Sequence, residues 1–307
     1  MEPREDFRPF NGIVGRRPAP AGASMSITKY LSLVKFEHSI FALPFVLIAA
    51  LVHAHGLPRV DQVLWMIVAA VGARTAAMAF NRITDRETDA RNPRTASREL
   101  PTGRVRLSQA WALTIAAAAV FVVAAAQLNR LCFALAFPAL VVLLGYSYTK
   151  RFTAWCHAAL GLSLAIAPVG AWLAVRPTID LPPLVLALGV VCWVAGFDII
   201  YALLDEPFDR EHGIHSAVVA LGPRGALALS AALHLAFVLA VAAFGWLVGL
   251  GGAFAAAVIV VVIVLSVEHA LVTPRDLSRV NAAFFTANGI ASLLLLGGTA
   301  LDLYLRR

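Results

Sequence analysis

The sequence has little charge. Only 14% of its 307 residues are Asp, Glu, Lys or Arg, against roughly 25% in an ordinary globular protein, while 60% are hydrophobic. A soluble fold of this length needs a polar exterior, and there is too little polar material here to cover one. The same richness in apolar residues excludes a mainly disordered chain. The composition therefore predicts an integral membrane protein.

Cysteine is also scarce. Cys132, Cys156 and Cys192 are odd in number and lie scattered in apolar runs, which indicates neither a disulfide framework nor a metal site. The sequence contains no signature of RNA or DNA binding. Its formal net charge of +7 is typical of basic loops held at the cytoplasmic face of a membrane. We therefore expect no nucleic-acid partner, and the sequence predicts no protein partner.

Long apolar runs alternate with short polar gaps. Because a membrane-spanning helix needs roughly 20 apolar residues, the runs predict nine helices, near residues 38–54, 62–81, 107–127, 131–149, 155–174, 184–203, 224–248, 251–271 and 281–301. The expected fold is an all-α bundle of nine transmembrane helices in residues 25–307, in contact with membrane lipid. Residues 1–24 are polar and bear Pro and Arg, so we expect a disordered extension, with Met25 as a candidate true start.

Lys and Arg are unevenly divided between the two sets of gaps. One set, with the N-terminal segment, holds 19 of the 25 basic residues, and the opposite set holds 5. Basic loops stay in the cytoplasm. The split predicts a multi-pass protein of the inner membrane, with its N-terminus and two long polar gaps cytoplasmic and its C-terminus on the opposite side.

The first long gap carries acids at helical spacing. Asn81, Asp85 and Asp89 are four residues apart, so they lie on one face of a helix that leaves the membrane. Arg74 lies seven residues earlier, on the same face but inside the expected span. An ionisable side chain inside a span is expensive and is a functional hypothesis by default.

The second long gap repeats this arrangement. Asp198, Tyr201, Asp205 and Asp209 follow one face of a helix that leaves the same side of the membrane. Pro207 is expected to end or distort that helix locally, which weakens the prediction at Asp209.

The two gaps together suit a diphosphate held by metal ions. They contain nine of the 18 acidic residues, and clustered carboxylates repel unless a cation lies among them. Mg²⁺ takes one or two carboxylates and completes its shell with water and phosphate oxygens. The alternative is that these acids are solvated loop charges paired with neighbouring arginines. Two such motifs in corresponding positions favour the metal.

Basic side chains stand near the acids. Arg94 and Arg98 are four residues apart in the first gap, and Lys150 and Arg151 close the fourth expected span. Guanidinium groups suit bidentate contacts with phosphate, and lysine acts as a point charge. For Lys150 and Arg151 the alternative is anchoring at the membrane surface without a ligand.

At these residues the sequence resembles the UbiA superfamily of intramembrane aromatic prenyltransferases. NRITDRETD matches the family pattern N-x-x-x-D-x-x-x-D, and YALLDEPFD matches D-x-x-x-D. The family commonly has Asp after the first Asn, where this chain has Arg82. The resemblance is strongest to the 4-hydroxybenzoate polyprenyltransferase-like branch. Segments such as KFEHSIFALPF and YSYTKRF equally resemble its MqnP-like members, which act on 1,4-dihydroxy-6-naphthoate in the futalosine route to menaquinone.

The resemblance implies transfer of a polyprenyl chain from its diphosphate to a carbon of an aromatic acid. It implies that Mg²⁺ and the diphosphate are organised by five side chains: Asn81, Asp85, Asp89, Asp205 and Asp209. Phosphate charge would be held by Lys150, Arg94 and Arg98. Arg74 would face the carboxylate of the acceptor, and its alternative is a structural ion pair with Asp198 or a neighbouring acid.

Further polar residues have open roles. Tyr146 and Tyr201 are candidates to bond phosphate or to face the allylic cation, and packing is equally favoured. Asn281 and Asn288 favour hydrogen bonds between helices. A membrane transporter is the competing function, but transporters place ionisable groups near the bilayer midplane, often in inverted repeats. A structural membrane subunit is a third interpretation, and it leaves both acidic motifs unexplained.

Overall fold

A computed structural model describes residue 33 and residues 43–306 of the chain. The long helices are α2 (Leu43–His53), α3 (Val60–Thr84), α5 (Leu107–Leu128), α6 (Arg130–Thr149), α7 (Cys156–Val175), α8 (Leu181–Ala202), α10 (Ala217–Leu247), α11 (Gly252–Leu271) and α13 (Asn288–Leu305). Shorter ones are α4 (Arg86–Arg91), α9 (Glu206–Glu211), α12 (Val280–Ala282) and the π-helical turn η2 (Ala283–Ala287).

Eight helical segments of the described residues are long and apolar enough to cross a membrane, the last of them running from α12 through α13. The predicted all-α membrane bundle is thereby confirmed. The count of nine stays a prediction. Its first span, 38–54, is represented by the 11 residues of α2, and residues 34–42 lie outside the described part. The expected extension at residues 1–24 also lies outside it.

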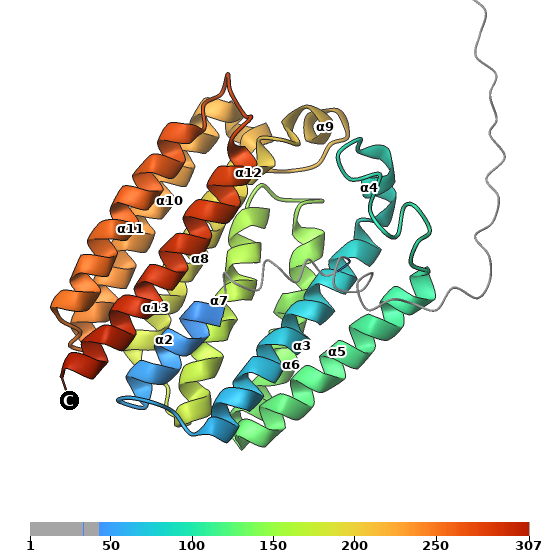
Figure 1. Ribbon diagram of the computed structural model, residues 1–307. Coiled ribbons are helices and arrows are strands. Elements are labelled where there is room, and N and C mark those ends of the chain that lie inside the picture. Colours follow the sequence, from blue (N-terminus) through green and yellow to red (C-terminus); the bar gives the residue numbers. More distant parts are fainter. Residues whose placement is uncertain (1–32, 34–42, 307) are drawn as a thin grey trace, which may run out of the picture.

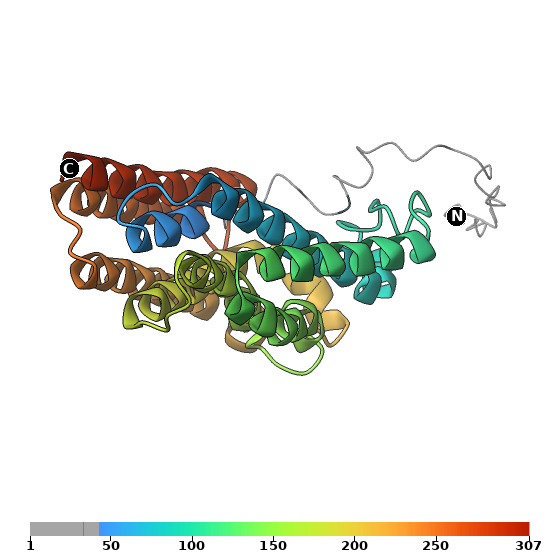
Figure 2. The same ribbon diagram turned by 90° about the horizontal axis from the view of Figure 1, so that it is seen from below.

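The helices run side by side, with the two short helices α4 and α9 together at one end of the bundle and the C-terminus at the other (Figure 1). The short helix α2 packs between α7 and α13 (Figure 2). The two acidic motifs therefore share one end of the bundle, as their spacing between spans predicts.

Close packing holds the helices together, because lipid tails are as apolar as the helix surfaces and drive no hydrophobic association. At Gly161 in α7, a Cβ atom would lie 2.5 Å from the carbonyl oxygen of Val191 in α8, so only glycine permits this approach. Trp193 of α8 is fully buried, with its ring centroid 5.0 Å from Phe45 and 5.7 Å from Phe237. Helices α7 and α8 thus form a closely packed pair.

One irregularity interrupts α10. Gly222 has a φ of 71° and is followed by Pro223, so the first turns of α10 bend away from its membrane-spanning part. That break explains why the apolar run is expected to start at residue 224. In α13 the amide of Asn288 donates to Glu268 of α11 at 2.8 Å, which confirms the predicted bond between helices. Asn281 is exposed.

Candidate active site

The two acidic motifs fold into similar turns. We call residues 81–91, where α3 meets α4, the first acidic turn, and residues 201–211, where α8 meets α9, the second acidic turn. Asp85 joins its helices at φ −90° and ψ −1°, and Asp205 does so at φ −105° and ψ −3°. In each turn the amide of the acid four residues later donates to the carbonyl of the junction acid, at 2.7 Å and 2.8 Å. Equal spacing thus gives a similar start to α4 and α9, although the link between the helices is one residue long in the first turn and three residues long in the second.

Pro207 does not break the second helix where the sequence predicts. Helix α8 already ends at Ala202, and residues 203–205 form the junction. Pro207 then stands in the first turn of α9, where the missing N–H costs nothing because that group has no partner within a helix. The two acids of this turn consequently stay four residues apart on one short helix.

Asp85 of the first acidic turn is buried. Asp85 has 3% of its surface exposed, and its Oδ2 accepts from Lys150 Nζ at 2.6 Å and from Asn81 Nδ2 at 3.1 Å. Lys150 is therefore bonded directly to the first acidic turn. Arg151 instead donates to the Thr84 carbonyl at 2.7 Å, at the end of α3.

Asp89 is held from the loop that follows α4. It is 5% exposed, and its Oδ1 accepts from Arg98 Nη1 at 2.6 Å. The hydroxyl of Thr95 donates to the Asp89 carbonyl at 3.1 Å. These contacts fold residues 92–98 back over the first acidic turn.

The second acidic turn is reached from the same loop. Arg94 Nε donates to Asp205 Oδ1 at 2.7 Å, and its Nη2 pairs with Oδ2. Its Nη1 donates to the hydroxyl of Tyr201 at 3.1 Å, and its guanidinium lies 5.1 Å from the centroid of that ring. Asn92 donates to Asp205 at 2.9 Å. Asn92 was not singled out in the sequence, where nothing ties it to a residue 113 positions away.

The carboxyl group of Asp209 has a shifted pKa. Burial raises the pKa of its carboxyl group to about 6, and the neighbouring Asp205 adds to that rise. Lys150, Arg94 and His157 act on the same carboxyl and lower its pKa. The Asp209 carboxyl group therefore takes up a proton as the pH falls toward 6.

The donor set fits a divalent cation. Asp85 Oδ1 and Asp89 Oδ2 are buried without a hydrogen-bond partner, and a buried orphan carboxylate oxygen is costly. Within the described residues, no three His, Cys, Asp or Glu side chains converge closely enough to hold a metal by themselves. The two orphan oxygens suit Mg²⁺, which uses few carboxylates and completes its shell with water and phosphate oxygens.

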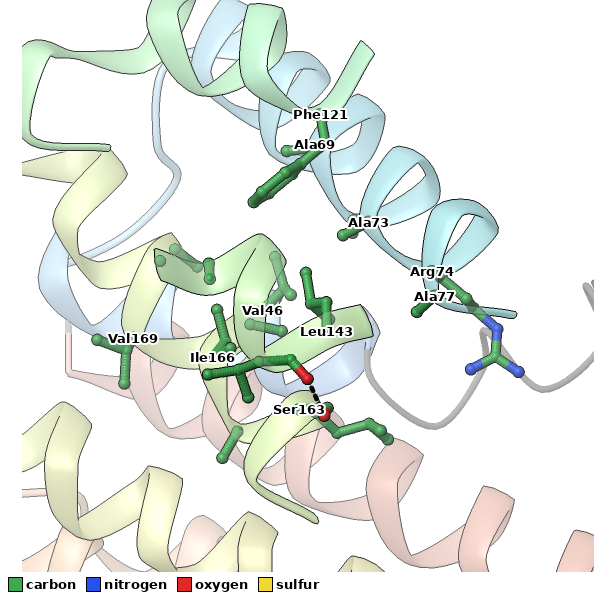
Figure 3. Close-up of a pocket in the computed structure, with 18 of the residues that line it drawn as sticks. Val46, Ala69, Ala73, Arg74, Ala77, Phe121, Leu143, Ser163, Ile166 and Val169 are labelled. Carbon is green, nitrogen blue, oxygen red and sulfur yellow. Dashed lines mark hydrogen bonds between the residues drawn. The ribbon is translucent and has the colours of Figure 1, made fainter. Parts of the chain in front are cut away.

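An apolar cavity of about 770 Å³ extends into the bundle from residues of α2, α3, α5, α6, α7 and α8. Ala69, Ala73 and Ala77 line it at intervals of four residues along α3, facing Val46, Phe121 and Ile166 on other helices (Figure 3). The small side chains of α3 leave space in the cavity. The walls have almost no hydrogen-bond donors or acceptors. It suits a hydrocarbon chain.

Arg74 and Tyr146 are polar exceptions in that wall. Tyr146 lies four residues before Lys150, and Arg74 lies 11 residues before Asp85, so both stand deeper than the acidic turns. Asp198 does not pair with Arg74: its Oδ2 lies 2.7 Å from Nδ1 of His157. His157 was missed in the sequence. An ionisable residue inside an apolar run was the available signal.

Arg82, which replaces the acid common in the resembled family, is directed elsewhere. It is 5% exposed, and its Nε donates to the carbonyl of Leu33 at 3.3 Å. Asp85 and Asp89 keep their positions without it, so the departure leaves the first acidic turn intact.

Known proteins are similar to this chain in sequence and in fold. The UbiA prenyltransferase family matches residues 42–290. A 4-hydroxybenzoate octaprenyltransferase from Aromatoleum aromaticum is 29% identical over 279 residues, covering 90% of this chain and 95% of that protein. One from Methylobacillus flagellatus is 30% identical over 243 residues, covering 79% and 82%.

Solved structures show the same arrangement of helices. The apo structure of a UbiA homolog from Aeropyrum pernix K1 superposes with a TM-score of 0.79 at 35% identity, covering 87% of this chain and 98% of that one. A UbiA homolog from Archaeoglobus fulgidus, bound to GPP and Mg²⁺, superposes with a TM-score of 0.70 at 19% identity, covering 90% and 99%. At that lower identity the likeness concerns the fold alone.

Proposed function

The chain belongs to the UbiA prenyltransferase family, and from that premise we propose that it transfers a polyprenyl chain from polyprenyl diphosphate to a ring carbon of 4-hydroxybenzoate. The observation that carries the proposal is an apolar cavity whose wall reaches Met78 on α3 and Tyr146 on α6, one turn short of Asn81 and Lys150. Beyond it stand the two acidic turns, whose carboxylates pair with Lys150, Arg94 and Arg98. A substrate with a charged head and a long hydrocarbon tail matches this division. The transporter and structural-subunit interpretations lose their support, since the family is one of enzymes.

The head of the donor belongs among the acidic turns. Mg²⁺ would be held by five side chains: Asn81, Asp85, Asp89, Asp205 and Asp209. When bound, it neutralises negative charge on the diphosphate as that group leaves. The Archaeoglobus homolog, bound to GPP and Mg²⁺, supports the choice of ion.

Basic side chains supply the rest of the diphosphate site. Lys150, Arg94 and Arg98 each hold one carboxylate in the structure, and each stands where it can exchange that partner for a phosphate oxygen. Arg94 is suited to two parallel bonds with phosphate, and Lys150 to a single point contact. Through its bond to Arg94, Tyr201 keeps the guanidinium over the second acidic turn.

The tail and the acceptor belong in the cavity. Its alanine-lined wall excludes water from the allylic cation that forms when the C–O bond breaks, so capture by an electron-rich ring outcompetes hydrolysis. Arg74 supplies a cation for the acceptor carboxylate at this depth, and Tyr146 offers a hydroxyl and a ring face beside it.

An acceptor assay tests the assignment. The purified protein is given one polyprenyl diphosphate, Mg²⁺ and, separately, 4-hydroxybenzoate, 1,4-dihydroxy-6-naphthoate or 1,4-dihydroxy-2-naphthoate. We expect prenylated 4-hydroxybenzoate, in line with the relatives named for that activity. Exclusive prenylation of 1,4-dihydroxy-6-naphthoate would instead assign the enzyme to menaquinone biosynthesis. The sequence segments resemble the MqnP-like enzymes of that route equally well. We place the reaction at the cytoplasmic face of the inner membrane, on the side with the excess of basic residues.

A further inference from the structure

A histidine and an aspartate form a defined pair at the cytoplasmic ends of α7 and α8. His157 Nδ1 lies 2.7 Å from Asp198 Oδ2, and the backbone N–H of Ala217 donates to His157 Nε2 at 3.2 Å. Because Nε2 accepts a hydrogen bond, it carries no proton. The proton of the neutral ring is therefore on Nδ1, and it is donated to Asp198.

The two members of the pair differ in exposure. The side chain of His157 is 5% exposed, whereas that of Asp198 is 28% exposed. His157 orients one carboxylate oxygen, and the described residues provide no hydrogen bond to the other, Oδ1. Asp198 thus presents a free acceptor oxygen from a fixed position, which is the arrangement of a base held by a buried orienting group.

Along the chain, the pair lies between the cavity wall and the second acidic turn. On α7 the cavity wall reaches Leu160, three residues from His157. On α8 it reaches Val191, seven residues before Asp198, and Asp205 follows seven residues after. A donor with its head at the acidic turns and its tail in the cavity has its scissile C–O bond between them, at the level of Asp198.

Aromatic prenylation requires a proton acceptor at that level. We propose that Asp198 is the catalytic base that removes the ring proton of the acceptor, and that His157 is the positioning residue that aims it. The proposal rests on the proposed function, because it presumes that an aromatic ring captures the prenyl cation.

The step balances as follows. The bond between C1 of the prenyl chain and the diphosphate oxygen breaks, and its electron pair leaves with the diphosphate. The ring carbon forms a bond to C1 with a pair of ring electrons, and the ring becomes cationic. Asp198 Oδ1 takes the proton from that ring carbon, the C–H electron pair restores the aromatic ring, and Asp198 later passes the proton to water. No oxidant or reductant takes part.

The test uses Asp198→Asn with 4-hydroxybenzoate deuterated at the ring carbon that is alkylated. In the wild type, proton loss follows C–C bond formation quickly, so protonated and deuterated acceptors react at equal rates. In Asp198→Asn we expect formation of the prenylated ring to fall about 100-fold or more and to be slower for the deuterated acceptor. Diphosphate release should continue, with prenol as the product.

A structural role for Asp198 predicts a different result. Equal losses of diphosphate release and prenylated product, with no difference between the two acceptors, would overturn the proposal, as would full activity of Asp198→Asn. If the wild type alkylates another ring, the same comparison uses that ring in deuterated form. Failure of the acceptor assignment is thereby separated from failure of the base.

Variants of His157 keep the proposal testable if Asp198→Asn does not fold. His157→Gln can still donate to Asp198 and accept from Ala217, so we expect it to retain coupled product formation, whereas His157→Leu should release excess prenol and show the isotope difference. Loss of coupling in both, or in neither, contradicts the positioning role. His234→Gln is the matched control: it alters a histidine that is also buried, 3% exposed, and bonded to His269, and it should leave the ratio of product to diphosphate unchanged.

Discussion

The two acidic turns have similar backbones and different environments. In the first, Asp85 and Asp89 are 3% and 5% exposed, and each has its own basic partner and one orphan oxygen. In the second, the side chain of Asp205 is 17% exposed and is held by Arg94, which comes from the loop after the first turn. The same D-x-x-x-D spacing therefore specifies where the acids stand but not which cations meet them.

The helices that lead to the turns also differ deeper in the bundle. Helix α3 carries the cation Arg74 in the wall of the cavity, and α8 carries the anion Asp198 beside His157. One side of the substrate path can thus attract a carboxylate while the other can accept a proton. The two helices thus carry similar acids at the acidic turns but side chains of opposite charge deeper in the bundle.

The largest expected effect on activity comes from neutralising one acid in either acidic turn. We expect Asp85→Asn and Asp205→Asn each to lower Mg²⁺-dependent diphosphate release by about 100- to 1,000-fold, because each removes charge that organises the cation. The measurement is pyrophosphate released from polyprenyl diphosphate, with folding checked by thermal melting. Full activity in either variant would remove that turn from the cation site.

Conservative changes of the arginines should sharpen the difference between the turns. Arg94 engages both oxygens of Asp205 and also Tyr201, whereas Arg98 makes a single bond to Asp89. Lysine cannot reproduce a bidentate contact. Arg94→Lys should therefore lower kcat/KM for the prenyl diphosphate about 10-fold, and Arg98→Lys should lower it less. Equal losses would mean that only the charge of these residues matters.

Removing Arg74, the cation deeper in the bundle, should weaken binding of the aromatic acceptor and leave binding of the prenyl diphosphate unchanged. For Arg74→Ala we expect the KM of the aromatic acid to rise about 10-fold, the effect of losing one charge-assisted bond, with the KM of the diphosphate unchanged. Steady-state kinetics with each substrate varied in turn measure this split. Arg74→Lys is the matched control, and its KM for the aromatic acid should lie between those of the wild type and of Arg74→Ala. An unchanged acceptor KM and kcat in Arg74→Ala would take Arg74 out of the acceptor site.

The smallest effect concerns Asp209 and stability. Its pKa, raised to about 6 by burial and by Asp205, means that its contribution to stability is present below the unfolded pKa near 3.8 and is lost as pH rises through about 6. Asp209→Asn should therefore stabilise the metal-free protein at pH 7.5, by about 1 kcal/mol after allowance for solvent screening, and leave it unchanged near pH 4. Thermal melts in a chelator at both pH values test this, and a gain that is equal at both would contradict it.

Several features of the site follow from local pattern. Asp85 and Asp89, like Asp205 and Asp209, could be placed on one helical face because a spacing of four fixes direction on a helix. The bend at Pro207 could not be placed correctly. Its missing N–H is tolerated in a first turn, so the position of the break depended on where the buried end of α8 stops.

The contacts that complete the site were beyond the reach of pattern. Lys150 meets Asp85 across 65 residues, and Arg94 meets Asp205 across 111. His157 drew no attention, because its partners Asp198 and Ala217 lie 41 and 60 residues away. Which of several arginines reaches which carboxylate depends on how the loops fold over the bundle.

The sequence by itself determined the membrane class of the protein, the apolar runs of its spans and the common side of the two acidic motifs. These depend on composition, hydropathy and helical periodicity, which act over a few turns of chain. Only the tertiary structure decided the partner of each carboxylate, the extent of the alanine-lined cavity and the pairing of His157 with Asp198. Those depend on contacts between helices far apart in the chain, and the packing that creates them, such as the approach of α7 to α8 at Gly161, has no local signature.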